Sequence, residues 1–167
     1  ETLGEYKNTF DILRTVRSVV IKQNEPDDDS SIYEIFNRLN TGGQNLSAQE
    51  IRMSMYYSPF YKKIIELNSQ TKWRKMLRQA QADVHFKDVE ILLRAFAMLF
   101  EYETYSSPMG RFLNTFSKTA NGFKQELIDY LEALFVSFLD SCDNLSEMAF
   151  NTKQGQFSIS LFESIFV

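Results

Sequence analysis

A glycine-containing loop between two helical segments is the stretch of the sequence whose residue types are best suited to bind a ligand. Asn40, Thr41, Gly42 and Gly43 end one helical segment, and Ser47 begins the next. Glycine backbones let an anion approach closely, the N–H groups of a turn can surround it, and a helix N-terminus favours negative charge. These residues are therefore candidates for contacts with a phosphate. A second interpretation stays open, in which the glycines only permit the turn.

Two charged residues follow in the first turn of the second helix. Glu50 lies three residues after Ser47, the spacing of a capping box, in which a hydroxyl and a carboxylate each accept a backbone N–H. Arg52 is a candidate for a phosphate contact or for an ion pair with Glu50 or another acid. The capping box explains Glu50 more simply than a chemical role does.

A cluster of basic residues lies between residues 60 and 82, where six Lys and Arg side chains accompany one acid, Glu66. With Trp73 among them, cationic groups that meet phosphates and a ring that stacks on a base would form a nucleic-acid patch. In the alternative interpretation the charges lie on a solvated helix face, and Trp73 packs into the core with Met76 and Leu77. The basic residues are Lys62, Lys63, Lys72, Arg74, Lys75 and Arg78, of which Lys72, Arg74, Lys75 and Arg78 are the candidate phosphate contacts.

Other site chemistry finds little support in the composition. One cysteine, Cys142, excludes an internal disulfide framework and a multi-thiolate zinc site, and one histidine, His85, excludes sites with several imidazoles. The acidic run 27–29 lacks the spaced carboxylates and central glycine of a calcium loop, so we predict a solvated turn and no metal site. The net charge of −4 disfavours a general nucleic-acid coat. The longest uncharged apolar run, from Ala95 to Phe100, is too short to span a membrane.

Hydrophobic periodicity predicts that these residues are positioned by a mainly α-helical chain of 167 residues. Residues 17–23 are the only convincing strand, β-branched and bounded by polar residues. Because an isolated strand cannot satisfy its own backbone groups, its partner strands are expected upstream of the chain. We predict the end of an upstream α/β subdomain in residues 1–29 and a multi-helix orthogonal bundle in residues 30–167. A short helix is expected at 9–16, and further helices at 30–39, 47–58, 60–67, 71–78, 87–102, 107–116 and 123–140. Ser107 is expected as the N-cap of the helix at 107–116, with Pro108 at its first position. The apolar segment 157–167 is expected to pack against the helix at 123–140, as a helix or alternatively as a strand.

The helix that precedes the glycine loop carries one continuous apolar stripe. Ile32, Ile35, Phe36 and Leu39 lie at positions i, i+3, i+4 and i+7, which share one face of a helix. This spacing predicts that the helix packs against a neighbouring apolar surface.

The segment from Ile32 to Arg52 resembles the Phe-x-x-x-Asn motif region of the domain of unknown function 262 family. This ParB/sulfiredoxin-like domain heads the GmrSD-type, modification-dependent restriction endonucleases. Phe36 and Asn40 match the motif positions. The resemblance extends over nearly the whole chain through four further features, which are Asp88–Ala97, Tyr105, Met109–Asn114 and Phe157–Glu163.

The resemblance implies the C-terminal helical part of a bacterial restriction or anti-phage protein, and a start at Glu1 fits a fragment of a larger cytoplasmic protein. The family's Asp-Gly-Gln-Gln-Arg-type motif, associated with nucleotide hydrolysis, is absent, as is the His-Asn-His nuclease domain. We therefore expect the fragment to be inactive alone and to need no cofactor. The intact protein would use a nucleoside triphosphate with Mg²⁺. Its partners would be the missing N-terminal ParB-like subdomain, DNA and a downstream nuclease domain, with no membrane.

By this resemblance the helical part completes a nucleotide- or DNA-facing pocket and is not itself catalytic. Phe36 would pack beneath the pocket and Asn40 would project an amide that both donates and accepts hydrogen bonds. The alternative is a non-enzymatic helical module that binds a protein partner through residues 17–23 and the acidic turn. The candidate nucleotide- or DNA-binding residues are Phe36, Asn40, Thr41, Gly42, Gly43, Glu50 and Arg52.

Overall fold

The computed structural model describes residue 35 and residues 46–146 and 148–167 of the chain. This part is mainly α, with seven α-helices, 66% helical content and essentially no strands, which confirms the predicted class. Its backbone pairing outside helices includes an isolated bridge between Asn151 and Phe157. The predicted helix at 9–16, the predicted strand at 17–23 and the expected domain boundary near residue 29 lie outside the described residues. The same holds for the predicted helix at 30–39, apart from residue 35, and for the loop at 40–43.

Each helix of the structure overlaps one of the helices expected from periodicity. The elements are α3 (Ala48–Met55), α4 (Pro59–Asn68), α5 (Thr71–Leu77), α6 (Lys87–Glu101), the 3₁₀ helix η2 (Tyr102–Thr104), α7 (Met109–Ala120), α8 (Gln125–Ser141) and α9 (Ile159–Phe166). Among the described residues, no helix has the length and apolar character needed to cross a membrane.

Side-chain caps fix where three of the helices begin, and the Ser158 hydroxyl provides the cap of α9. Ser47 and Glu50 form the predicted capping box at the start of α3. The Ser58 hydroxyl accepts the Tyr61 N–H at the start of α4, where Pro59 occupies a position that needs no donor. The start of α7 differs from the prediction, because Pro108 rather than Ser107 is the N-cap residue. Pro108 has an extended ψ of 151°, which delays the helix by one residue.

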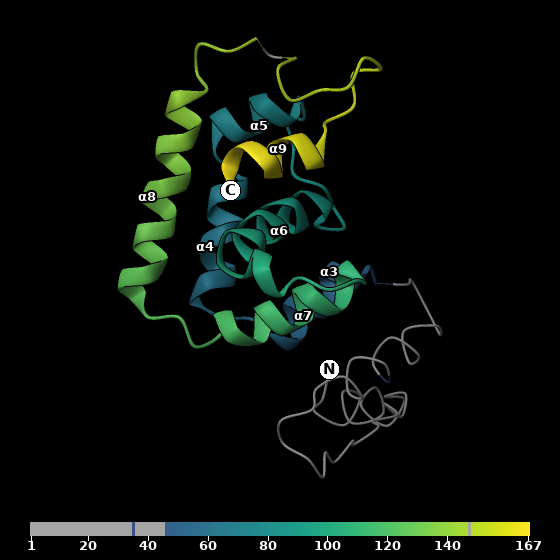
Figure 1. Ribbon diagram of the computed structural model, residues 1–167, viewed down its shortest axis with the longest axis vertical. Helices are drawn as coiled ribbons and strands as arrows, with labels where there is room; N and C mark the ends of the chain where they lie inside the picture. The colour runs from purple at the N-terminus through teal and green to yellow at the C-terminus, as the bar shows by residue number, and fades with distance from the viewer. Residues whose placement is uncertain (1–34, 36–45, 147) are drawn as a thin grey trace, which may run out of the picture.

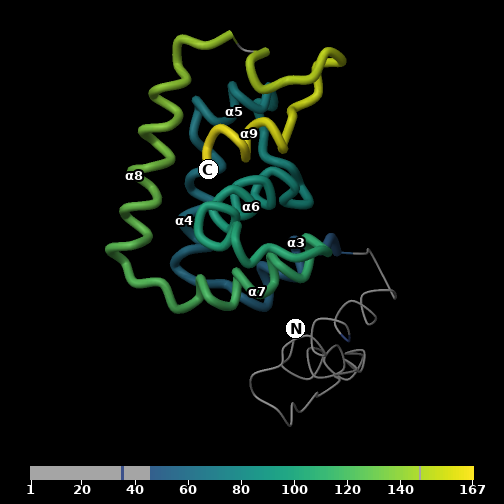
Figure 2. The backbone as a smooth tube through the Cα atoms, in the orientation of Figure 1, coloured from purple at the N-terminus to yellow at the C-terminus, as the bar shows by residue number. Residues whose placement is uncertain are grey.

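Helix α6 lies in the middle of the bundle and is the element around which the others pack (Figure 1). It contacts α3, α4, α7 and α9. Its buried face includes Val89, Leu92, Leu93, Phe96 and Ala97, the apolar positions that periodicity places on one side. Figure 2 shows α8 running along the side of the bundle opposite α3.

Aromatic side chains fill the space between α5, α6, α8 and α9. Trp73 is fully buried and lies with its ring centroid 5.1 Å from that of Phe162. Phe138 of α8 meets Phe166 of α9 edge to face at 5.2 Å, a geometry that aromatic quadrupoles favour. The prediction that the C-terminal segment packs on the helix at 123–140 is confirmed, and the segment is a helix.

Candidate functional site

The start of α3 is held by a small group of polar contacts. The Glu50 carboxylate accepts the Ser47 N–H at 2.5 Å, and the Ser47 hydroxyl accepts the Glu50 N–H at 3.1 Å. The Ser47 hydroxyl also donates to the His85 carbonyl at 2.9 Å. The His85 ring Nδ1 lies 3.4 Å from the Glu50 carboxylate. The hydrogen bond from the Ser47 amide holds the pKa of Glu50 below its ordinary value.

Arg52 is buried beneath this group and joins three helices. Its guanidinium donates to the Asn114 amide oxygen of α7 at 2.9 Å and forms an ion pair with Glu90 of α6 at 3.3 Å. It also donates to the side-chain oxygen of Gln49 within α3. Arg52 is 1% exposed, so its guanidinium interacts with groups inside the fold. These interactions fix α3 against α6 and α7.

Two hollows flank the start of α3. The first, which we call the Lys87 hollow, has a volume of about 380 Å³ and lies between α3, α6 and α9. The second, the Tyr57 hollow, measures about 390 Å³ and has Glu50 in its lining. Both hollows are open to solvent, with volumes in the range of small-molecule sites. The Lys87 hollow is lined in part by Ser47, Gln49, His85, Lys87, Glu90 and Arg94, and the Tyr57 hollow by Leu46, Glu50, Met53, Ser54, Tyr57 and Phe86.

The Lys87 hollow combines charged, polar and apolar groups. Lys87 and Arg94 bring positive charge, and Arg94 is oriented by the Glu163 carboxylate at 2.6 Å. Ile91 and Ile159 supply apolar wall. Gln49 is 1% exposed, and its side-chain nitrogen has no hydrogen-bond partner in the described part of the chain. Glu90 also lines the hollow and pairs with Arg52, as Arg94 pairs with Glu163, so Lys87 is the lining group that suits an anionic ligand with an apolar portion.

The basic side chains of residues 62–78 lie in different environments, and Lys63 and Lys72 form ion pairs with nearby acids. Lys63 bridges Glu66 at 3.1 Å and Glu132 at 2.7 Å. Lys72 bridges Asp140 at 3.1 Å and Asp143 at 2.9 Å. These acids offset much of the positive charge that the sequence concentrates here.

Two members of the cluster point inward. The Trp73 ring is buried and its N–H donates to Asn68 at 3.0 Å, so the interpretation of Trp73 as a core residue is confirmed. Arg74 is 7% exposed and pairs with Asp88 at 2.6 Å. Burial alone would raise the pKa of Asp88, but the Asp83 amide and the Arg74 guanidinium hold that pKa below its ordinary value. Arg74 therefore ties α5 to the start of α6.

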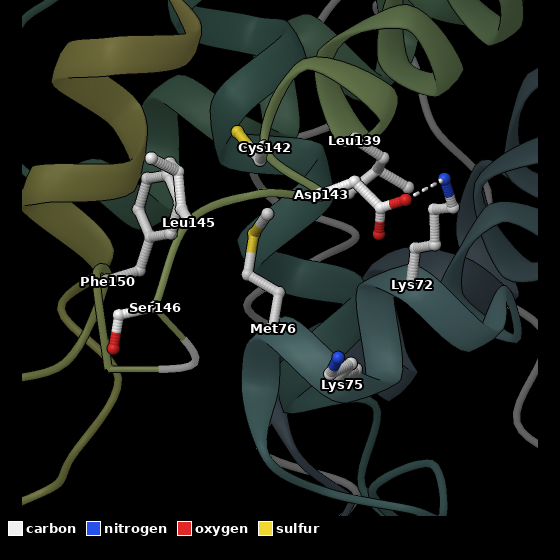
Figure 3. Close-up of a pocket in the computed structure, with 9 residues that line it drawn as sticks. All are labelled: Lys72, Lys75, Met76, Leu139, Cys142, Asp143, Leu145, Ser146 and Phe150. Atoms are coloured by element: carbon white, nitrogen blue, oxygen red, sulfur yellow. Dashed lines mark hydrogen bonds and ion pairs between the residues drawn. The ribbon is translucent and has the colours of Figure 1, made fainter.

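The remaining candidates of the cluster, Lys75 and Arg78, lie near the loop between α8 and α9. Lys75 lines a hollow of about 50 Å³ together with Lys72 and Cys142 (Figure 3). Arg78 adopts a left-handed backbone and its guanidinium lies 3.0 Å from the Met148 sulfur. A hollow of this size holds one or two water molecules rather than a nucleotide. Burial raises the pKa of the Cys142 thiol, which disfavours the reactive thiolate.

The structure brings Glu50 and Arg52 together at the α3 start, whereas Phe36, Asn40, Thr41, Gly42 and Gly43 lie outside the described residues. Sequence reasoning missed His85, Lys87 and Arg94, which come from the start and middle of α6 and its preceding loop. No local sequence pattern identifies these residues, because they come close to α3 only when α6 packs against it. No group of three or more His, Cys, Asp and Glu side chains suited to a metal occurs among the described residues.

Comparison with known proteins adds no relative: no family model, no curated protein and no solved structure matches the chain. The segments that carry the resemblance nevertheless share a structural property. Asp88, Glu90 and Asn114 supply the partners of Arg74 and Arg52, and Glu163 supplies the partner of Arg94. The polar residues of these segments thus connect the helices around α6.

Proposed function

We propose that the chain is the helical part of a bacterial modification-dependent restriction protein, in which the start of α3 helps to form a nucleotide- or DNA-facing pocket. The observation that supports this most directly is the Lys87 hollow, which lies at the start of the helix that follows the glycine loop. The Lys87 ammonium suits a phosphate, and the apolar wall suits a base or sugar.

In this proposal the described residues position a ligand and do not carry out the reaction. Lys87 attracts the phosphate, Arg94 stays paired with Glu163, and the capping box keeps the start of α3 in place. Asn40 and the glycines that follow it reach the same ligand from the loop. In the intact protein, an upstream ParB-like subdomain would hydrolyse the nucleotide with Mg²⁺, and a downstream nuclease domain would cleave modified DNA.

Ligand binding by the intact protein tests this proposal. Wild type, Asn40→Ala and Lys87→Ala are titrated with fluorescent ATP and GTP analogues and with a modified DNA duplex. Loss of a charge-assisted hydrogen bond costs about 1.5–3 kcal/mol, so we expect each substitution to raise Kd about tenfold or more. Asn144→Ala, in the exposed loop after α8, is the matched control and should bind normally.

Thermal unfolding of each variant separates loss of the site from loss of the fold. A rise in the Kd of the variants for the nucleotide analogues supports a nucleotide-binding pocket. A rise in their Kd for the duplex alone supports a DNA-binding pocket. Unchanged binding of both ligands by well-folded Asn40→Ala and Lys87→Ala proteins would refute the proposal.

A further inference from the structure

The Tyr57 hollow exposes apolar side chains that a folded domain would ordinarily cover. Tyr57 is 64% exposed and Leu46 is 38% exposed, and both line the hollow with Met53 and Phe86. Val84, two residues before Phe86, is 81% exposed. Exposed apolar groups beside a hollow with an apolar lining suit contact with another apolar surface.

One wall of this hollow is formed by Phe86, whose backbone is in a conformation that costs conformational energy. Phe86 is the N-cap of α6 and has φ 57° and ψ 28°, in the left-handed region that bulky residues rarely adopt. Its side chain is partly buried against the core while it lines the hollow. Packing of the ring therefore offsets the strained backbone and fixes one wall of the hollow.

We propose that the Tyr57 hollow is the docking site of the apolar stripe formed by Ile32, Ile35, Phe36 and Leu39 of the same chain. Ile35, the described member of the stripe, is helical and half-buried. The chemistry matches, because aliphatic and aromatic side chains of the stripe would meet Leu46, Met53, Tyr57 and Phe86.

The length of the connection favours this occupant over a separate partner. Six residues, 40–45, separate Leu39 from Leu46, and Leu46 itself lines the hollow. The seven Cα–Cα steps from Leu39 to Leu46 span at most about 25 Å. A tether this short gives an effective concentration in the millimolar range, which a second protein would have to exceed.

This docking would bring Asn40 and the glycine loop beside the start of α3, whatever ligand binds there. The inference does not depend on the proposed nucleotide or DNA ligand. It can therefore fail or succeed separately from the proposed function.

Chemical crosslinking of the full chain tests the docking. The native thiol is removed by Cys142→Ser, and Leu39→Cys is combined with Tyr57→Cys, whose side-chain position is exposed. The control pair combines Leu39→Cys with Tyr130→Cys, which is 62% exposed on α8, on the opposite side of the bundle from α3 (Figure 1). A short bismaleimide is added at low protein concentration, and the products are identified by mass spectrometry.

We expect intramolecular crosslinking of the 39–57 pair to exceed that of the 39–130 pair by at least about tenfold, as proximity dictates. Adding Phe36→Asp should lower the 39–57 yield to the level that the short tether alone gives, while a melting curve shows that α3–α9 remain folded. A 39–57 yield that Phe36→Asp leaves unchanged would overturn the proposal. Equal yields for the two pairs would overturn the proposal. A 39–57 crosslink formed only between two chains would overturn it as well, because the occupant would then be a second copy.

Discussion

Replacement of Arg52 by alanine tests how the start of α3 is held. Arg52 is 1% exposed and has a side-chain partner in each of three helices, namely Gln49, Glu90 and Asn114. Removing one member of a buried ion pair costs about 3–5 kcal/mol, because the other member loses its partner. The Glu90 side chain is 34% exposed and can be rehydrated, so we expect about 3 kcal/mol, near the lower end of this range.

Urea and thermal unfolding, followed by circular dichroism, measure this loss. For a domain of this size about 3 kcal/mol corresponds to a fall in Tm of about 6–12 °C. Arg111→Ala is the matched control, since Arg111 is an exposed arginine on α7. Its substitution should change the free energy of unfolding by less than about 0.5 kcal/mol.

Comparison with the Glu90→Gln variant shows whether the ion pair or the whole hydrogen-bond network matters. Glu90→Gln leaves the contacts of Arg52 with Gln49 and Asn114 in place. We therefore expect it to cost less than Arg52→Ala. A loss of unfolding free energy below about 1 kcal/mol for Arg52→Ala would refute the reasoning, because removing one member of a buried ion pair should destabilise the fold by more than that.

Three further predictions concern single groups. Asp88→Asn leaves the buried Arg74 guanidinium without its carboxylate, and unfolding should show a loss of about 3–5 kcal/mol. The hydrogen bond from the Ser47 amide holds the pKa of Glu50 below its ordinary value of 4.5. The ionised Glu50 carboxylate therefore contributes to the stability of the fold at neutral pH. That contribution is lost as the pH falls from 4.5 through the pKa of the folded state, so melting temperatures of Glu50→Gln should depend less on acid pH than those of wild type. The Cys142 thiol, whose pKa burial raises, should react with a disulfide reagent more slowly in native protein than in urea; equal rates would contradict the raised pKa.

Local sequence patterns predicted the helices because their causes are local. Apolar residues three and four apart define the buried face of α6, and the Ser47–Glu50 spacing defines the start of α3. The same reasoning did not identify the partners of the charged residues. Glu90 lies 38 positions after Arg52, and Asp88 lies 14 positions after Arg74. Such pairs exist only once the helices pack, so the sequence alone left Arg52 and Arg74 as candidates for external phosphates.

Pairing within the fold changes which residues are available to a ligand. Arg52 and Arg74 meet carboxylates inside the protein, and each connects a neighbouring helix to α6. A phosphate at the α3 start would have to compete with those carboxylates for Arg52, whereas Lys87 lines the hollow from the exposed first position of α6. We therefore expect Lys87→Ala to weaken ligand binding at unchanged Tm, and Arg52→Ala to lower Tm. Binding that is lost with Arg52→Ala at normal stability, and kept with Lys87→Ala, would reverse this assignment and place the guanidinium in the site.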